Sequence, residues 1–297
     1  MANKKKILLT GASGFIGSAA ADYFRSLGHT VIGLSRRPAT DTLVWDPSAG
    51  RIDPLPGDLD AIVHLAGENI FGRWTKRKKQ RIYRSRIDGT KLLAEQISAA
   101  AHKPKVLVCA SAVGFYGDRG DDVLTEAAPP GKGFLADVCR DWEAAAAPAR
   151  QAGIRTTHLR FGMVLDKQGG ALAKMLSAFK MALGGKLGNG RQWVSWISRM
   201  EVLRIIDFVL HTDSLDGPVN AVCPEPVQNH TFTRTLGQIL NRPTVLPAPA
   251  FALQLALGDF ARETLLASTR AVPEKLQKTG FAFQHATLRD ALLAVIQ

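Results

Sequence analysis

The chain has 297 residues, of which 46% are hydrophobic and 22% are charged. This length fits one large α/β domain, alone or with a smaller lobe, and this composition excludes an intrinsically disordered chain. The formal net charge of +12 predicts an anionic partner, for which a phosphate-rich cofactor and nucleic acid are both candidates.

The three cysteines, Cys109, Cys139 and Cys223, lie far apart, with neither a metal-ligand spacing nor a disulfide framework. Such usage is typical of a reducing compartment. No stretch approaches the ~20 apolar residues of a membrane-spanning helix. We therefore expect a cytoplasmic protein that holds no metal and has no membrane partner.

A short apolar run, residues 7–9, ends at three glycines with the spacing Gly-x-x-Gly-x-x-Gly. Apolar residues then recur at three- and four-residue steps up to residue 27, which predicts a strand, a tight turn and a helix. In such a turn the glycines permit the bend, admit a phosphate and let helix and strand pack closely. A second apolar run at 30–34 completes the spacing of a βαβ unit, so the motif favours dinucleotide binding over a purely structural turn. The predicted phosphate loop comprises Gly11, Ser13, Gly14, Phe15, Ile16 and Gly17.

The end of the second strand indicates which dinucleotide is bound. NAD-binding folds place an acidic residue there, on the ribose hydroxyl. Here the strand ends in Ser35 and Arg36, and no carboxylate occurs before Asp41. Because a guanidinium can pair with a 2′-phosphate through two hydrogen bonds, this ending favours NADP(H) over NAD.

Further apolar runs predict core strands at 60–66, 105–111, 156–161 and 217–222, with helices over 134–149, 171–183 and 201–210. Residues 37–59 are expected to be mostly loop, with a short strand at 44–46. His64 lies inside an apolar strand and is expected to be a packed core residue. The small residues Ala66 and Gly67 at the end of that strand would let a cofactor come close.

Residues 76–86 carry seven basic side chains on a stretch with a helical apolar face. We interpret them mainly as a solvated helix face, with Arg86 as the member that reaches the cofactor phosphates. Nucleic-acid binding stays an alternative, although the stretch lacks the interleaved aromatic residues of single-strand binders.

The segment 184–197 is rich in glycine, basic and aromatic residues. Glycines alone would fit a structural loop, but two tryptophans beside basic and amide side chains favour a ligand wall. The residues predicted to contact substrate are Arg191, Gln192, Trp193 and Trp196.

The character of the chain changes at Pro247 and Pro249, after which come apolar helical segments and an aromatic stretch at 280–283. We predict a cofactor domain over 1–246, with 184–197 as its substrate loop, and a small lobe over 247–297. A lobe of about fifty residues is unlikely to fold alone, so it should dock on the main body near the cleft.

Several motifs occur in an order that resembles the extended short-chain dehydrogenase/reductase superfamily: TGASGFIG at 10–17, HLAGE at 64–68, SAVGFYG at 111–117 and RFGMVL at 160–165. More narrowly, the chain resembles the atypical sugar-nucleotide-epimerase-like branch, also called cell-division-inhibitor-like, in the segments LSRR, GFLADVCRDWE, GGKLGNGRQWVSWI and NRPTVLPAP. The resemblance implies a doubly wound parallel sheet of the Rossmann type with a smaller C-terminal lobe on the substrate side. It also implies an NADP-type cofactor held by the glycine loop and by Ser35, Arg36, Leu65, Ala66, Arg86 and Met163.

The usual chemistry of this superfamily needs a tyrosine whose pKa is lowered by a lysine four residues later. None of the three tyrosines of this chain has a lysine at that spacing, and residues 133–139 of the helix that should carry the pair offer no useful acid or base. Tyr116, with Ser111 nearby, and Glu68 are the remaining candidates for acid/base work.

We therefore predict an NADP(H)-binding divergent oxidoreductase or epimerase that acts on a small substrate, anionic or a sugar nucleotide, as a monomer or homodimer. The alternative is a non-enzymatic NADP(H)-binding regulator, which the missing Tyr-Lys pair favours and the ligand-like 184–197 loop disfavours.

The residues at the end of the second strand predict which of the two nucleotides, NADPH or NADH, the protein binds more tightly. NADPH should bind about tenfold or more tightly than NADH, because one charge-assisted hydrogen-bonded pair contributes about 1.5–3 kcal/mol. Calorimetric titration of both ligands measures the difference, and Arg36→Ala should remove it. Equal affinities in the unaltered protein would contradict the assignment.

Overall fold

A computed structural model describes residues 4–39 and 41–296. Its centre is an eight-stranded sheet in the order β12-β8-β6-β5-β1-β2-β3-β4, in which every neighbouring pair is parallel except β3 and β4. The strands are β1 (Lys6–Thr10), β2 (Thr30–Ser35), β3 (Thr42–Asp46), β4 (Arg51–Ile52), β5 (Ala61–His64), β6 (Val106–Ala112), β8 (Arg155–Phe161) and β12 (Gly217–Ala221). The chain runs outward from β1 to one edge and then from β5 to the other, so the predicted doubly wound sheet is confirmed.

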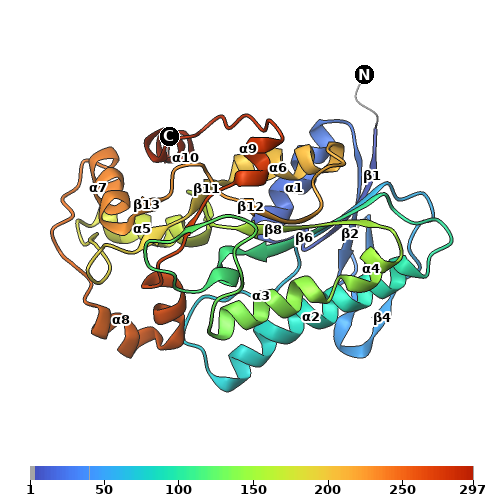
Figure 1. The fold of residues 1–297 in the computed structure, drawn as a ribbon, viewed down its shortest axis with the longest axis horizontal. Coiled ribbons are helices and arrows are strands. Elements are labelled where there is room, and N and C mark those ends of the chain that lie inside the picture. The colour runs from blue at the N-terminus through green and yellow to red at the C-terminus, as the bar shows by residue number, and fades with distance from the viewer. Residues whose placement is uncertain (1–3, 40, 297) are drawn as a thin grey trace.

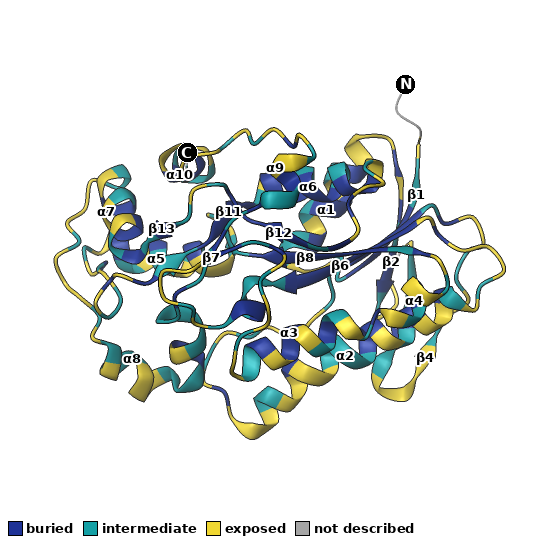
Figure 2. Cartoon of the chain, in the orientation of Figure 1, coloured by how far each residue is buried: buried dark blue, intermediate teal, exposed yellow. Residues whose placement is uncertain are grey.

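Helices cover both faces of this sheet (Figure 1). One face carries α2 (Lys76–Ser98), α3 (Phe134–Ala144) and α4 (Ala147–Gln151), and the other carries α1 (Phe15–Ser26), α6 (Arg199–His211) and α9 (Glu274–Lys278). The central strands are therefore buried throughout (Figure 2), as parallel strands between two helical layers must be. In β1, Ile7 and Leu9 pack into one core and Leu8 packs into the other, because successive side chains of a strand point to opposite faces.

Two sequence predictions need correction. The helix expected over 134–149 is interrupted: α3 ends at Ala144, and α4 starts at Ala147 with Pro148 in its first turn. Proline has no N–H and its ring collides with the preceding turn, so one continuous helix cannot pass through it. The predicted loop 37–59 does contain the expected strand, which is β3, but it also holds the short 3-10 helix η1 (Pro47–Ala49) and β4, which extend the sheet.

Beyond the main sheet, three two-stranded ladders link distant parts of the chain: β9 (Met163–Asp166) with β11 (Trp196–Ser198), β10 (Trp193–Val194) with β13 (Val227–Gln228), and β7 (Val123–Leu124) with β14 (Arg270–Ala271). The remaining helices are α5 (Gly170–Lys180), α7 (Asn229–Ile239), α8 (Ala250–Leu257) and α10 (Leu288–Ile296), with η2 (Val113–Tyr116) and the π-helical turn η3 (Ala261–Leu265).

The C-terminal residues dock on the main body. Strand β14 extends β7, and Phe260 packs edge-on against Trp74 at a centroid distance of 5.8 Å. Among the helices of the described residues, none combines the length and the apolar character that a bilayer crossing requires.

The third glycine of the loop gives a test of how tightly the first βα unit is packed. A Cβ atom on Gly17 would lie 2.0 Å from the carbonyl oxygen of Gly11, so Gly17→Ala must displace backbone. We expect a loss of about 1–3 kcal/mol in unfolding free energy, measured by denaturant titration. Gly57→Ala is the matched control, because its Cβ would meet nothing closer than a His102 ring atom at 3.8 Å. Equal stability of the two variants would contradict this packing.

Candidate functional site

The turn between β1 and α1 has the shape of an anion-binding loop. Gly11 has a φ of +70°, and the N–H of Gly14 donates to its carbonyl oxygen at 2.8 Å. Helix α1 begins after Gly14, and no side chain caps its first N–H groups. These groups and the helix dipole are therefore available to a phosphate.

The same turn lies against the end of β5. A Cβ atom on Gly11 would stand 2.9 Å from the carbonyl carbon of Leu65 and 3.0 Å from the nitrogen of Ala66. Leu65 and Ala66 are half-buried, and Gly67 beside them is exposed. A flat ligand that follows the sheet edge would thus pass over backbone and small side chains, which fits a dinucleotide.

A buried hydrogen-bond chain holds these two strand ends together. The Thr10 hydroxyl oxygen accepts the N–H groups of Leu65 and Ala66, both at 3.1 Å, so its own proton goes to His64 Nδ1 at 2.7 Å. His64 Nε2–H then donates to Thr90 Oγ1 at 2.9 Å. Burial lowers the pKa of His64 to about 4, so the ring is neutral. The prediction that His64 is a packed core residue is confirmed.

The end of β2 presents the residues predicted to select the nucleotide. Ser35 is half-buried, and its hydroxyl oxygen accepts the N–H of Arg37 at 3.2 Å. Arg36 is exposed and has no ion-pair partner within residues 4–39 and 41–296. Its guanidinium is therefore free to meet a phosphate.

Arg86, predicted to reach the phosphates, lies directly behind the end of β5. Its Nη1 donates to the carbonyl oxygens of Glu68 at 3.0 Å and Ile82 at 3.2 Å, and its guanidinium lies 4.9 Å from the centre of the Trp142 ring. A Cβ atom on Gly67 would come within 3.2 Å of this guanidinium. Arg86 thus supports the backbone of residues 65–68. A ligand that passes over Gly67 would come next to its guanidinium.

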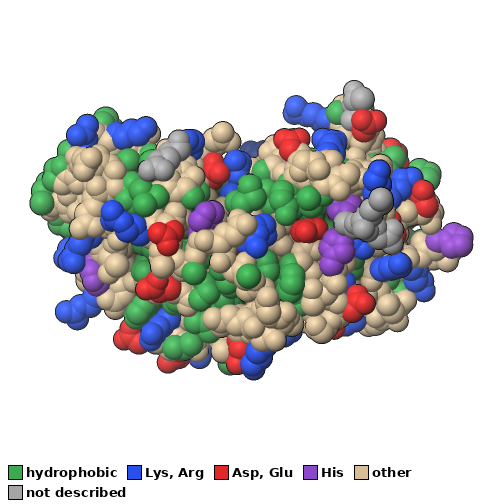
Figure 3. All heavy atoms as spheres, turned by 90° about the horizontal axis from the view of Figure 1, so that it is seen from above, with side chains coloured by type: hydrophobic (Ala, Val, Ile, Leu, Met, Phe, Trp, Pro, Cys, Tyr) green, Lys and Arg blue, Asp and Glu red, His purple; other side chains and the backbone are tan. Residues whose placement is uncertain are grey.

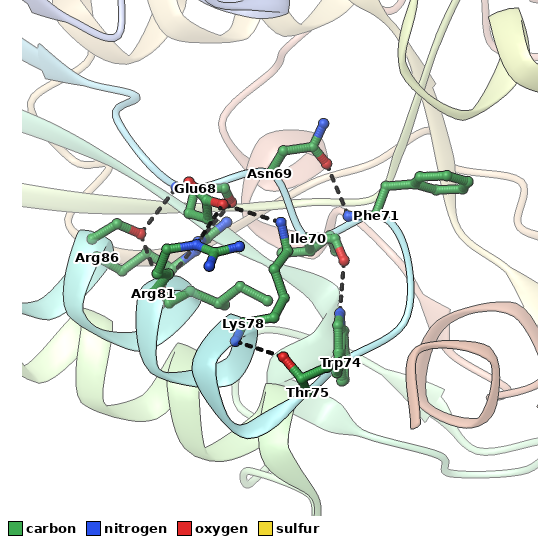
Figure 4. Close-up of polar contacts among 11 residues, drawn as sticks. Glu68, Asn69, Ile70, Phe71, Trp74, Thr75, Lys78, Arg81 and Arg86 are labelled. Carbon is green, nitrogen blue, oxygen red and sulfur yellow. Dashed lines mark hydrogen bonds and ion pairs between the residues drawn. The ribbon is translucent and has the colours of Figure 1, made fainter. Parts of the chain in front are cut away.

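Glu68 is held by cations and not left free as a base (Figure 4). Its carboxylate accepts from Lys78 Nζ at 3.1 Å and from Arg81 Nε at 3.3 Å. Burial alone would raise the pKa of Glu68, but the hydrogen bonds and charges of Lys78 and Arg81 outweigh it and lower the pKa. A carboxylate stabilised in this way is a weak proton acceptor.

Tyr116 and Ser111 lie in a buried polar network instead of a cleft. The Tyr116 hydroxyl donates to Asn220 Oδ1 at 2.7 Å and accepts from Arg160 Nη1 at 2.9 Å, and the side chain is fully buried. Burial raises the pKa of Tyr116 despite the opposing charge of Arg160. Ser111 is 2% exposed and donates to Glu143 Oε1 at 2.7 Å. The structure therefore argues against the predicted acid/base role of Tyr116, because its proton is engaged and solvent cannot reach it.

The centre of this network is an ion pair that the sequence reading did not find. Arg160 on β8 donates from Nε and Nη2 to the two carboxylate oxygens of Glu143 on α3, each at 2.8 Å. The guanidinium also stacks on Phe115 at 3.5 Å from the ring centre. The two charged residues are 17 positions apart in the sequence and lie in different elements. Only the packing of α3 against β8 reveals that they pair.

The helix expected to carry the Tyr-Lys pair presents Leu135 and Cys139, four residues apart. Both side chains lie against Gly114 at the end of β6. The carboxylate of Glu263, from the π-helical turn η3, reaches the same place and accepts the N–H of Leu135 at 2.9 Å. Its side chain is 13% exposed, and its Oε1 forms a long ion pair with Nη2 of the exposed Arg262 at 3.6 Å. The sequence reading missed Glu263, which follows Asp259 and Arg262 in a segment that shows no motif.

The four residues of the segment 184–197 that were predicted to contact substrate differ in how far they are buried. Trp196 is fully buried and its indole N–H donates to the carbonyl oxygen of Glu225 at 2.9 Å, so the prediction that it lines a ligand wall is wrong: it is a core residue. Gln192 is also buried and donates to the carbonyl oxygens of Leu187 and Leu265.

The other two residues of the predicted wall are more accessible. Trp193 is half-buried, bonds Asp121 through its indole N–H at 2.7 Å and lies 4.2 Å from the Arg270 guanidinium. Arg191 is exposed.

Comparison with known families agrees with this geometry. Residues 7–221 match the NAD dependent epimerase/dehydratase family, and residues 248–295 match a domain of unknown function called DUF1731. The chain belongs to the NAD-dependent epimerase/dehydratase family. The resemblance to extended short-chain dehydrogenases and the Rossmann-type fold are thereby confirmed.

Relatives of this family member span nearly its whole length. An epimerase family protein of Mycobacterium leprae is 43% identical over 293 residues, which cover 97% of this chain and 95% of the relative. A chloroplastic SDR39U1 homologue of Arabidopsis thaliana is 37% identical, with 98% of this chain and 86% of the relative covered.

Solved structures extend the likeness to three dimensions. Human epimerase family protein SDR39U1, crystallised with NADPH, superimposes with a TM-score of 0.92 at 32% identity and covers 98% of both chains. A nucleoside-diphosphate sugar epimerase from Corynebacterium glutamicum gives 0.82 at 34% identity, with 99% of this chain and 58% of that chain covered. MoeE5, in complex with UDP-glucuronic acid and NAD, gives 0.77 at 22% identity and so shows the fold alone.

The buried pair of this family member predicts a large stability effect. Arg160→Met should lower the unfolding free energy by about 3–5 kcal/mol, because it leaves the Glu143 carboxylate buried without a counter-charge. Chemical denaturation measures the loss. Arg140→Met is the control, since Arg140 pairs with Asp137 and Asp141 on an exposed surface and its removal should leave the midpoint unchanged. A small effect at Arg160 would show that the pair contributes little.

Proposed function

We propose that this epimerase/dehydratase family member binds NADP(H) and performs redox-assisted chemistry on a sugar nucleotide. The observation that carries the cofactor assignment is the open anion-binding turn at Gly11–Gly17 combined with an unpaired Arg36, and no carboxylate, at the end of β2. The human relative with NADPH, at 32% identity over nearly the whole chain, supports the same choice.

Each part of the proposed cofactor site has a separate task. The first-turn N–H groups of α1 hold the diphosphate, with Ser13, Phe15 and Ile16 shaping the turn, and Ser35 and Arg36 bind the 2′-phosphate. The backbone at Leu65, Ala66 and Gly67, backed by Arg86, forms the floor, and Met163 at the start of β9 borders the nicotinamide end. The nicotinamide, when bound, supplies a hydride donor or acceptor.

The substrate class rests on the family and on two relatives. The Corynebacterium glutamicum structure is named as a nucleoside-diphosphate sugar epimerase, and MoeE5 holds a UDP-sugar. In this chain we assign the substrate side to the lobe 247–297 and to Trp193 of the segment 184–197, while the buried Gln192 holds that segment against the lobe. The carbonyl oxygen of Leu265, in the lobe, accepts from Gln192, so the two parts close on each other.

We further propose Glu263 as the acid/base group in place of the missing tyrosine. It is a partly exposed carboxylate at the start of α3, where Leu135 and Cys139 stand at the Tyr-Lys spacing. Glu68 is neutralised by two cations, and the Tyr116 and Ser111 protons are engaged elsewhere. Its structural alternative is a helix cap, since Gly133 gives α3 no side-chain cap of its own.

A non-enzymatic NADP(H)-binding regulator is the second candidate function. The observation that favours it is the buried network around Tyr116, in which groups that could have served catalysis hold the fold together.

One experiment separates these proposals. The protein is incubated with NADP⁺ or NADPH and a panel of nucleoside-diphosphate sugars, while nicotinamide absorbance and sugar stereochemistry are followed. We expect turnover of at least one sugar, and Glu263→Gln should lower kcat by about 100-fold or more. Because the amide oxygen still accepts the Leu135 N–H, thermal stability and NADPH affinity should stay unchanged.

Other outcomes have definite meanings. Tight NADPH binding without turnover of any sugar would favour the regulator. Full activity of Glu263→Gln would assign the proton transfer to another group, and loss of stability in that variant would identify Glu263 as a helix cap.

A further inference from the structure

A cleft lies at the end of the molecule that carries α7, and its residues are far along the chain from the glycine loop. It is a cleft of about 720 Å³ between the loop 184–191, the start of α7 and the segment 244–247. Its walls contain no Asp or Glu among the residues described. The lining side chains that matter for charge are Lys186, Arg191, His230 and Arg234.

The three permanent charges of this cleft lack counter-ions. Lys186, Arg191 and Arg234 are exposed, and none of them forms an ion pair with any residue in the described ranges. By contrast, Lys78 and Lys79 on α2 are each paired with a carboxylate. Basic side chains occur at this end of the molecule, at the left of Figure 3, as they do at its opposite end. The cleft therefore concentrates positive charge that the chain does not neutralise.

A buried hydroxyl at the same cleft lacks a partner. Thr233, on α7, is only 3% exposed and lines the cleft, and its Oγ1 forms no hydrogen bond within the described part of the chain. A buried polar atom without a partner costs about 1–3 kcal/mol, so such atoms are rare unless a ligand or water completes them. The hydroxyl can donate to an anion that enters between the cations.

The cleft is built rigidly, because its glycine-rich wall is fixed from two sides. The N–H of Leu187 donates to Asn229 Oδ1 at 2.8 Å, and the N–H of Ala248 donates to the carbonyl oxygen of Lys186 at 2.9 Å. His230 donates through both its backbone N–H, at 2.8 Å, and its Nδ1, at 3.0 Å, to the carbonyl oxygen of Gly190. These bonds fix the backbone that carries Lys186 and Arg191, so the wall of the cleft does not have to be ordered when a ligand binds.

The cleft is also distinct from the proposed substrate side. The Gln192 side chain points to the carbonyl oxygen of Leu265 in the C-terminal lobe, whereas its neighbour Arg191 lines the cleft against α7. Helix α7 begins here after Gln228, and its first two N–H groups, of Asn229 and His230, donate to the carbonyl oxygens of Gln192 and Gly190. None of the residues proposed to hold NADP(H) takes part.

We propose that this cleft is a second anion site that binds a small phosphorylated compound through its diphosphate or paired phosphoryl groups. Lys186, Arg191 and Arg234 supply the charge, and Thr233 Oγ1 donates a hydrogen bond from the floor. Three cations without an acid match a doubly or triply charged group better than a single carboxylate.

Inorganic pyrophosphate is the probe, titrated calorimetrically at constant ionic strength into protein saturated with NADPH or, if NADPH does not bind, into the unliganded protein. The unaltered protein should bind it, and Arg234→Gln should weaken binding about tenfold. Arg84→Gln is the matched control: it removes the same charge from an exposed position on α2 and should leave the affinity unchanged.

Thr233→Val tests the floor of the cleft independently. It should weaken pyrophosphate binding about fivefold or more, without lowering the melting temperature, because the unpartnered hydroxyl contributes nothing favourable to the fold. The proposal is overturned if pyrophosphate does not bind, if Arg84→Gln weakens binding as much as Arg234→Gln, or if neither cleft variant changes the affinity.

Discussion

The proposed cofactor site depends on a direct backbone contact between the turn after β1 and the end of β5. No side chain fits between Gly11 and the Leu65–Ala66 peptide. The Thr10 hydroxyl stabilises this contact. Its oxygen accepts the N–H groups of Leu65 and Ala66, and its O–H donates a hydrogen bond to Nδ1 of the neutral His64 ring. The start of α1, whose N-cap residue Gly14 provides no side-chain cap, lies beside this contact, where its first-turn N–H groups can bind a phosphate.

The second organising feature is the packing of α3 against the end of β6. Leu135 and Cys139 pack against Gly114 at the spacing where a tyrosine and a lysine are usual. Nearby, Arg160 and Glu143 form a buried ion pair that orders Tyr116 and Ser111. The polar groups next to the sheet end therefore form their hydrogen bonds with one another. The proposed proton transfer is therefore assigned to a group from outside the cofactor half, the carboxylate of Glu263 in η3.

The C-terminal lobe connects these features. It extends β7 through β14, places Glu263 at the start of α3 and receives the amide of Gln192. On its other side, residues 244–247 and the start of α7 enclose a basic cleft. The lobe thus places a carboxylate near the sheet end, and only the first of its described residues, Pro247, reaches the cleft with the unpaired cations.

Local patterns in the sequence were sufficient for the glycine loop, the βα alternation, the position of Ser35 and Arg36 at the end of β2 and the core role of His64. These features depend on spacing within a few residues, or on periodicity along one strand or helix. The break at Pro148 was readable by the same logic and was missed.

Tertiary structure alone decided which polar residues face each other. Glu143 and Arg160 meet across two elements, Trp196 turns into the core, and Glu263 reaches a helix 128 residues earlier in the chain. Burial and long-range pairing arise from how layers pack, and no periodicity within one segment encodes which side chain of another segment will lie opposite.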